Sequence, residues 1–466
     1  MKSKIVIPFL LFFLGGWMAS VKNGYANKKE SMKTWVNVGG VESILAEKHD
    51  QPLVSFIITF PFGAYTDPDD KGGLTNLLGE MLMRGTVRKS REEIENTLDF
   101  LGANLDIDAG SHSLMVIGKV LSRNLDQLFS LVIEILTEPT FPEEELNKVR
   151  EQIIAQLYLR LEDDAQLARQ KFMENLYEGH PYSRDPVGTL ASLKVIKKED
   201  IENHYKTYLH RGGLLVGTAG DVTKPKLEDL IHKLVKVLPE GKADPKVRSF
   251  EKKLEGIEII LIDKPERTQT QFIIGHPGID ARDRDFFPLN IFVTAFAGHM
   301  FQAQYMQEIR VKRGWAYGAY GSVDARRDGG AFYLYTFPKN ADTLPALKLS
   351  LELLDKAVHG NGVTDESLEF AKKHLSRSFP FLIDIPEKVI SQAIVQKLLG
   401  RSDDYLEKYV GNIQAVTPAQ ARAAAKKHLS TKDLEIVMLC TAKEFQKTIG
   451  KELLAKSVKV VPFDQL

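Results

Sequence analysis

The sequence predicts an α+β fold of two homologous halves, each an antiparallel-rich sheet packed with helices, which a linker joins into a clamshell. Three observations predict it. The chain of 466 residues is too long for one ordinary core. Strand-like and helix-like segments follow one another in the same order in both halves. A stretch rich in Lys, Glu, Gly and Pro around 239–255 separates the halves and is typical of a solvated linker.

We therefore expect an N-terminal domain over residues 27–240, a linker over 241–256 and a C-terminal domain over 257–466. Two halves joined by a hinge would enclose a cleft. With 43% hydrophobic and 27% charged residues, the composition is that of a soluble globular protein. The formal net charge of zero gives no indication of binding to nucleic acid or to an anionic membrane.

Residues 1–26 have the parts of a secretory signal peptide. Lys2 and Lys4 precede an apolar run over residues 5–18, and small residues close the polar stretch that ends at Ala26. The run is short for a spanning helix, which needs roughly 20 residues, although an uncleaved anchor stays the alternative. No cysteine follows the run, so a lipoprotein anchor is not expected. We expect export, to the periplasm of a Gram-negative bacterium, with no membrane contact beyond it.

Cys440 is the only cysteine of the chain. It can form neither an internal disulfide nor a thiolate metal cluster. Because it lies in the apolar run over residues 436–440, we expect a buried side chain that acts as a small hydrophobe.

In the first half, residues 53–60 read as a strand, and Leu and Met recur at helical spacing over 74–82. Ser90 and Glu93 form a capping box that opens the next helix, which Gly102 closes. Residues 105–120 supply strands, and residues 125–136 form another helix. From Thr140-Phe141-Pro142 we expect a long helical stretch that runs towards Gly179.

The second half repeats this order. We expect strands over 257–263 and 269–275, a mainly helical segment over 288–310, and a strand pair over 315–323 and 330–337. Helices follow over 345–358 and 364–377, and the latter matches the helix that begins after Phe141-Pro142.

Three short segments anchor a family resemblance. They are the Gly85-Thr86 end of the first helix, the Pro139–Glu143 turn, and the run Gln307–Tyr317 (QEIRVKRGWAY), which is the most specific. On these residues the chain resembles the pitrilysin/insulinase metallopeptidase family, and within it the short-chain subgroup that includes mitochondrial processing peptidase. The resemblance extends over nearly all of the chain after residue 26.

Active members of that family carry His-x-x-Glu-His on a helix and a Glu about 76 residues further on. The two His and the distal carboxylate hold Zn²⁺, and the intervening Glu activates the bound water. Alignment on Gly85-Thr86 puts the two His positions at Asn76 and Glu80, the base at Gly79 and the distal ligand near Gln156.

All four positions have the wrong chemistry for zinc hydrolysis. Asn76 and Gln156 offer neutral amides, Gly79 has no side chain, and Glu80 alone does not hold zinc. Loss of the general base lowers the rate of hydrolysis roughly 10²–10⁴-fold even where metal binds. We therefore expect no metal, no cofactor and no catalytic residue of its own in this chain.

The sequence offers no replacement site. Its eleven His include no pair one helical turn apart that flanks a Glu, and His112, His180 and His299 read as ordinary histidines. No phosphate-binding glycine loop, serine nucleophile elbow or cysteine nucleophile is present. Residues 297–301 (AGHMF) stand where the non-catalytic mitochondrial subunit has a glycine-rich loop.

Arg310 and Tyr317 are seven residues apart, at the junction where a helix gives way to a strand. Without the family resemblance, the sequence predicts a solvated Arg and a half-buried Tyr at these positions. The resemblance implies that they reach the zinc site, bind the substrate backbone and support the developing oxyanion, for which guanidinium and phenol donors are suited. Lys312 and Arg313 are expected on the solvated face.

The leading hypothesis is a non-catalytic, substrate-binding subunit of a heterodimeric zinc endopeptidase. A zinc-bearing homologue would be its partner, and an extended peptide or unfolded protein would be its substrate, added as a strand to a sheet edge. A stand-alone peptide-binding or structural subunit with no peptidase role is the alternative. An active peptidase with an unorthodox metal set around Glu80 is the third.

Overall fold

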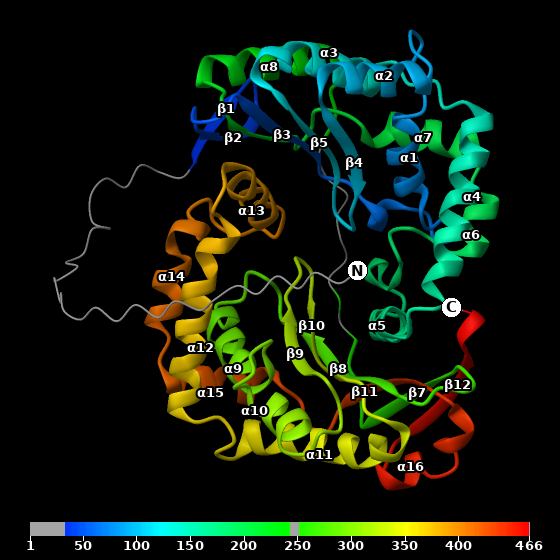
Figure 1. Ribbon diagram of the computed structural model, residues 1–466, viewed down its shortest axis with the longest axis vertical. Coiled ribbons are helices and arrows are strands. Elements are labelled where there is room, and N and C mark those ends of the chain that lie inside the picture. The colour runs from blue at the N-terminus through cyan, green and yellow to red at the C-terminus, as the bar shows by residue number, and fades with distance from the viewer. Residues whose placement is uncertain (1–32, 243–249, 251, 466) are drawn as a thin grey trace, which may run out of the picture. The chain divides into compact units, whose positions relative to one another are not determined.

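The computed structural model describes residues 33–242, 250 and 252–465, and places one six-stranded sheet in each half of the chain (Figure 1). The α+β class and the two similar halves are therefore confirmed. The predicted signal peptide and residues 243–249 and 251 of the predicted linker lie outside the described residues.

The first sheet has the order β1-β2-β6-β3-β5-β4. All neighbours are antiparallel except β2 and β6, which are parallel. Its strands are β1 (Thr34–Val38), β2 (Val41–Glu47), β3 (Leu53–Phe60), β4 (Asn104–Ala109), β5 (Leu114–Leu121) and β6 (Leu215–Gly220).

The second sheet has the order β12-β7-β11-β8-β10-β9. If β2, β6, β3, β5 and β4 are matched with β7, β11, β8, β10 and β9, each pairing has the same direction in both sheets. The sixth strands differ, because β1 is antiparallel to β2 whereas β12 is parallel to β7. The strands are β7 (Ile257–Asp263), β8 (Gln271–Gly278), β9 (Ala319–Asp324), β10 (Gly330–Thr336), β11 (Leu434–Cys440) and β12 (Ser457–Pro462).

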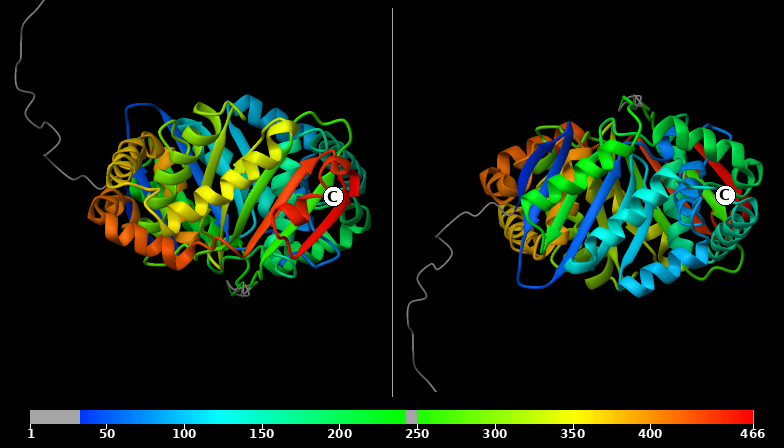
Figure 2. Two further views of the ribbon diagram at one scale, coloured as in Figure 1. Left: turned by 90° about the horizontal axis from the view of Figure 1, so that it is seen from below. Right: turned by 90° about the horizontal axis from the view of Figure 1, so that it is seen from above.

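Helices pack on the outer face of each sheet and form two cores with it. Figure 2 shows α11 crossing the second sheet in the view from below. The helices of the first half are α1 (Leu74–Leu82), α2 (Arg91–Leu101), α3 (Leu125–Thr137), α4 (Glu143–Arg160), α5 (Asp164–Leu176), α6 (Leu190–Val195), α7 (Lys198–Tyr208) and α8 (Lys224–Val237). Those of the second half are α9 (Phe286–Ala297), α10 (Gln304–Met306), α11 (Asn340–His359), α12 (Asp365–Ser378), α13 (Pro386–Leu398), α14 (Tyr405–Ala415), α15 (Pro418–His428) and α16 (Ile449–Glu452).

Local signals explain where several of these helices begin and end. The capping box of Ser90 and Glu93 is formed at the start of α2, and Gly102 closes that helix in the left-handed conformation. Thr364 caps α12 through a hydrogen bond from the backbone N–H of Ser367. Among the helices that the structure describes, none is long and apolar enough to cross a membrane.

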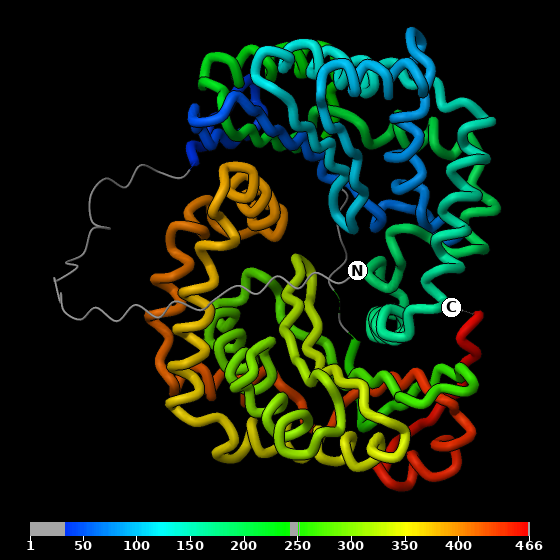
Figure 3. The backbone as a smooth tube through the Cα atoms, viewed as in Figure 1, coloured from blue at the N-terminus to red at the C-terminus, as the bar shows by residue number. Residues whose placement is uncertain are grey.

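The two halves exchange one helix each. Helix α5 of the first half packs on the second sheet, where Phe172 joins Ile273 and Val437 in one apolar cluster. Helix α13 of the second half packs on the first sheet, where Ile390 contacts the cluster that includes Ile57. The same exchange can be followed along the chain in Figure 3. Each sheet is therefore covered on its inner face by a helix from the other half.

Four predicted elements are corrected in detail. The helical stretch expected to run to Gly179 is two helices, because Asp163 caps a new one, α5. The mainly helical segment predicted over 288–310 is divided, because α9 ends at Ala297 and helical structure resumes with α10. The strand predicted from Trp315 begins at Ala319, since a loop precedes it. Helix α11 begins at Asn340, so Pro345 lies inside it and removes only one helical N–H bond near its start.

Candidate functional site

Helix α1 is the frame of the degenerate zinc positions, and a buried carboxylate holds its first turn. Asp67 accepts hydrogen bonds from the backbone N–H groups of Gly73 and Thr75, both at 2.9 Å, and from Thr75 Oγ1 at 2.6 Å. Burial raises the pKa of Asp67 to about 6 despite these donors. His204 Nε2 lies 2.9 Å from Thr75 Oγ1, and burial lowers the pKa of His204 to about 4. This network fixes the helix and has no solvent-facing group to use in catalysis.

The two positions that would carry His differ in their surroundings. Asn76 is half-buried, and Glu80 forms an ion pair with Arg84 one turn later, at 3.2 Å. Because the pair lies along the helix surface, the charge of Glu80 is already matched by a guanidinium. Gln156, at the predicted distal position, is exposed on α4.

The position of the general base is filled by its neighbours. A Cβ added at Gly79 would lie 3.2 Å from Leu114 Cδ1 and 3.3 Å from Ile107 Cγ2. These two side chains come from β5 and β4, the strands that pack against α1. A side chain at this position would therefore press on both neighbours from its first carbon onward.

The zinc implied by the family resemblance therefore does not fit these residues. Zinc sites use three or four His, Cys, Asp or Glu ligands. Asn76, Gly79, Glu80 and Gln156 supply a single carboxylate, which already pairs with Arg84. We derive no catalytic step from a metal in this chain.

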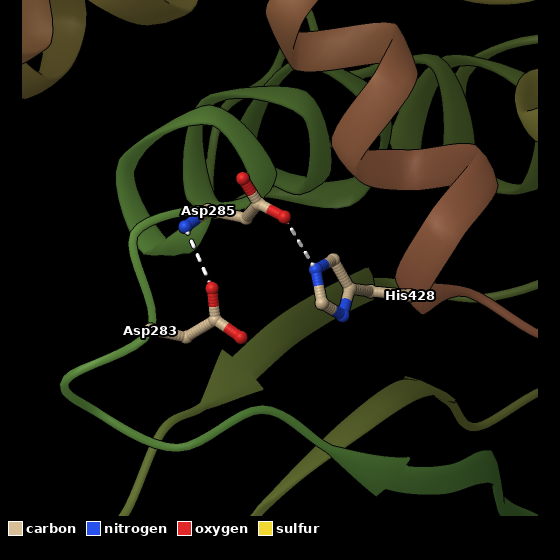
Figure 4. Close-up of side chains that lie close together, drawn as sticks. All are labelled: Asp283, Asp285 and His428. Atoms are coloured by element: carbon tan, nitrogen blue, oxygen red, sulfur yellow. Dashed lines mark hydrogen bonds and ion pairs between the residues drawn. The ribbon is translucent and has the colours of Figure 1, made fainter.

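One other group could hold a metal ion within the described ranges, and sequence reasoning missed it. Asp283, Asp285 and His428 bring one ligand atom each within 4.8 Å of one another (Figure 4). However, Lys427 Nζ and His428 Nε2 already bind the same oxygen of Asp285, at 2.7 and 2.8 Å. Because Lys427 occupies this oxygen, it is not available to a metal ion. The cluster instead connects the last turn of α15 to the start of α9.

Arg310 lies in a short π-helical turn, η4 (Gln307–Val311), where Lys312 N bonds to Gln307 O. Such turns are frequent at functional sites. The guanidinium stands over the ring of Phe301, with Cζ 4.8 Å from its centre. It makes no hydrogen bond or ion pair with any described residue, so its donors are unused. The neighbouring Arg313 and Lys312 both pair with Glu308 instead.

Tyr317 lies in the loop between η4 and β9 and is 76% exposed. Its hydroxyl has no hydrogen-bond partner in the described part of the chain. A single exposed tyrosine is common on a protein surface, and its hydroxyl, two residues before an edge strand, is free to bond to solvent or to a ligand. Among the residues that the structure describes, neither the Arg310 guanidinium nor the Tyr317 hydroxyl therefore has a hydrogen-bond or ion-pair partner.

Strand β9 begins directly after Tyr317 and is the edge of the second sheet. It pairs with β10 only, as β4 pairs only with β5 at the edge of the first sheet. Within the ranges described, the other side of each strand has no strand partner. An open edge of this kind can accept an extended peptide.

The other residues that the sequence singled out have ordinary surroundings. His112 lies in the turn between β4 and β5, with Nε2 2.6 Å from Tyr182 Oη, and burial lowers its pKa to about 4. His180 accepts a hydrogen bond from Tyr182 N, and His299 stacks on Tyr320. Cys440 is buried as predicted, and burial raises its thiol pKa to about 12, so it is no nucleophile.

Two sequence patterns of one peptidase family match this chain. Residues 43–189 match the insulinase pattern of peptidase family M16, and residues 196–375 match the peptidase M16 inactive domain. Together they cover well over half of the chain.

Individual relatives have low sequence identity to this chain, but each alignment covers most of the relative's length. An uncharacterized zinc protease of Streptomyces coelicolor is 22% identical over 392 residues, which is 83% of this chain and 85% of that protein. A Helicobacter pylori protein named non-peptidase homolog YmxG is 23% identical over 417 residues, 88% of this chain and 94% of that protein.

Solved structures show the same fold. A peptidase M16 inactive domain from Pseudomonas fluorescens has a TM-score of 0.81 at 22% identity, with 92% of this chain and 98% of that chain covered. A protease from Helicobacter pylori has a TM-score of 0.77 at 18% identity, with 88% and 99% covered.

Proposed function

Because the chain belongs to the insulinase family, peptidase family M16, we propose that it is a non-catalytic, substrate-binding subunit of a heterodimeric zinc endopeptidase. Its partner is a zinc-bearing homologue, and its substrate is an extended peptide or unfolded protein. The proposal includes export, with the complex at work in the periplasm.

One contrast carries the proposal. The base position at Gly79 is packed shut by Ile107 and Leu114, whereas Arg310 and Tyr317 stand with their donors unused. Solvated donors are common on protein surfaces, but these two come shortly before the open edge strand β9 in the chain. A chain that serves another subunit would need them there.

In this role Arg310 and Tyr317 act on the substrate held at the partner's metal site. The Arg310 guanidinium donates to a substrate carbonyl and to the oxygen on which negative charge develops, and the Tyr317 hydroxyl donates beside it. The substrate adds as a strand to an open edge, which gives affinity through main-chain hydrogen bonds. Selectivity for sequence then comes from side chains beside that edge.

The exchange of α5 and α13 supports action in trans. Each helix is buried on the sheet of the other half, so the two halves of this chain form one packed unit. Residues left free on the surface of that unit are then available to a second polypeptide.

The test begins with co-purification from the periplasmic fraction of the native source, with zinc measured in what is recovered. The chain and its partner are then expressed separately and mixed, and cleavage of an unstructured peptide is followed. We expect activity only in the mixture. Arg310→Ala should lower it about 10²-fold, as loss of an oxyanion donor does, with zinc content unchanged.

Arg313→Ala is the matched control, because Arg313 is an exposed arginine of the same segment that pairs with Glu308. It should stay within about twofold of the unsubstituted chain, since surface ion pairs contribute little. Full activity of the partner alone would overturn the proposal. Recovery of no zinc-bearing partner would favour a stand-alone peptide-binding or structural subunit.

A further inference from the structure

A cavity of about 330 Å³ lies where the exchanged helix α5 meets both halves of the chain. Its walls come from the β4–β5 turn, from α5, from the segment after the short helical turn at residues 181–183, and from the β9–β10 turn. The side chains used below are Ser111, Arg169, Tyr182, Ser183, Arg184 and Arg326. The volume is that of a small-ligand site rather than of a packing defect.

The lining of this cavity is cationic. Three guanidinium groups, of Arg169, Arg184 and Arg326, face a single carboxylate, that of Asp185. That carboxylate is already used, because it accepts hydrogen bonds from Arg160 Nη1 and from the backbone N–H of Val187, both at 2.9 Å. The cavity wall therefore holds no carboxylate that is free to pair with the three cations.

Two of the three guanidinium groups have partners outside the cavity. Arg326 donates to Asp324 Oδ2 from Nε and Nη2 and stands over the rings of Tyr177 and Tyr182. Arg184 pairs with Asp69, which is almost fully exposed, and donates to the carbonyl of Asp67.

Arg169 has no such partner. It makes no hydrogen bond or ion pair with any residue that the structure describes, and its guanidinium lies over the ring of Tyr333, with Cζ 5.3 Å from the centre. The aromatic face fixes the group without using its N–H donors.

The field around the cavity is consistent with this excess of cations. His112, whose imidazole contacts Tyr182 at the wall, has a lowered pKa because it is buried and because Arg327 and Arg326 are close. Because the imidazole of His112 is neutral, it does not change the net charge that an anion meets in the cavity.

Two arginines of the cavity wall connect it to the second sheet. Arg169 lies over the ring of Tyr333 of β10, whose partner in the edge strand β9 is Ser322. Arg326 lies in the turn that follows β9, so the end of that edge strand leads to the cavity wall.

We propose that this cavity binds a carboxylate of the extended peptide, either its C-terminus or an Asp or Glu side chain. Guanidinium forks match carboxylate geometry, and the hydroxyl group of Ser111 can add a further hydrogen bond, whereas those of Ser183 and Tyr182 already bond to His180 O and His112 Nε2. The inference rests on the proposed peptide binding and adds a charge preference to it.

The test uses the purified chain alone, without the zinc-bearing partner, and fluorescence anisotropy of labelled peptides. The probes are an N-acetylated peptide of about ten Ala and Ser residues whose only charge is its free C-terminus, its C-terminal amide, and an amidated version with one internal Glu. We expect one or both carboxylate peptides to bind at least about tenfold more tightly than the neutral amide. Which of the two binds identifies the source of the carboxylate.

Arg169→Gln should reduce binding of the carboxylate peptide to the level of the amide and leave the amide unchanged. Arg123→Gln is the control, because Arg123 is an exposed arginine with no partner among the described residues and lies outside the cavity. Equal binding of acid and amide, or no effect of Arg169→Gln, would overturn the carboxylate site and leave the proposed subunit role intact. Displacement by inorganic phosphate at lower concentrations than by acetate would overturn it in favour of a phosphate site. Failure of the mixed-subunit assay, with acid and amide still discriminated, would count against the subunit role alone.

Discussion

Gly79 shows at the residue scale why the metal site of this chain is more than a set of missing ligands. A glycine inside a helix costs about 1 kcal/mol relative to alanine. Here the absence of a side chain lets Ile107 and Leu114 pack directly against α1. The position has become part of the core of the first half, so restoring its chemistry conflicts with its packing.

We predict that Gly79→Glu lowers the free energy of unfolding by about 2–4 kcal/mol. The added side chain meets Leu114 Cδ1 and Ile107 Cγ2 at 3.2 and 3.3 Å from its first carbon, and it carries a charge into an apolar site. Gly79→Ala, the control, should change stability by less than about 1 kcal/mol, because helix propensity offsets the tighter contact. Urea unfolding measures both. Equal stabilities of the Glu and Ala variants would show that the site can open for a carboxylate.

At the scale of elements, local patterns in the sequence predicted much of what the structure contains. The strand at 53–60 and the helix that Ser90 opens and Gly102 closes have the predicted bounds, because their signals are local. The exchange of α5 and α13 was not predicted. Apolar spacing shows that a helix has a buried face but does not show which sheet covers it.

The candidate site was also predicted only in part, and again the local features were the predictable ones. Asn76, Gly79 and Glu80 were placed on one helix because their spacing is fixed by that helix. The two side chains that fill the base position come from strands about 30 residues further on, and no spacing rule connects them. The cavity beside Arg169 joins four separate segments of the chain, which only the tertiary fold brings together.

Gly217 of β6 is where the exchanged helix α13 comes closest to the first sheet. A Cβ there would lie 3.0 Å from Ile394 Cδ1 and 3.2 Å from Ile390 Cβ. We predict that Gly217→Ala costs about 1–3 kcal/mol and that Ile394→Val costs about 1 kcal/mol. The double variant should cost less than their sum by about 1 kcal/mol, because valine lacks the methyl group that the alanine meets.

Urea unfolding of the four chains in this double-mutant cycle measures the coupling. Gly411→Ala is the control, because nothing lies within 4 Å of a Cβ at Gly411 in α14. It should be neutral or stabilising by up to about 1 kcal/mol. Strict additivity of Gly217→Ala and Ile394→Val would contradict the close approach of α13 to the first sheet.

For the molecule as a whole, the contact between α5 and the second sheet contains one buried acid. Glu435 of β11 is fully buried and accepts a hydrogen bond from Asn175 Nδ2 of α5 at 2.8 Å. Its other oxygen, Oε1, has no hydrogen-bond partner in the described residues, and Lys252 Nζ lies 3.9 Å from the oxygen that Asn175 already bonds, Oε2. A half-satisfied carboxylate between the two halves makes their attachment sensitive to pH.

We predict that this attachment weakens as the pH rises. Burial is the main reason that the pKa of Glu435 rises from 4.5 to about 7, and Glu258 and Glu178 raise it further. The folded chain therefore holds the proton more tightly than the unfolded chain. The stability from this group is fully present below pH 4.5 and is lost as the pH rises through 7. Between pH 5 and pH 8 the loss is about 2 kcal/mol.

Glu435→Gln keeps the shape and a donor–acceptor pair for Asn175 but cannot ionise, so it should abolish this part of the pH dependence. The difference in unfolding free energy between the variant and the unsubstituted chain should grow in favour of the variant by about 2 kcal/mol from pH 5 to pH 8. Glu255→Gln is the control, because Glu255 is an exposed acid that pairs with Lys456. A difference that stays constant with pH would mean that Glu435 is ionised throughout and that Lys252 is an adequate partner. A difference that grows as predicted would show that α5 is held on the second sheet in part by a carboxyl group that must stay protonated.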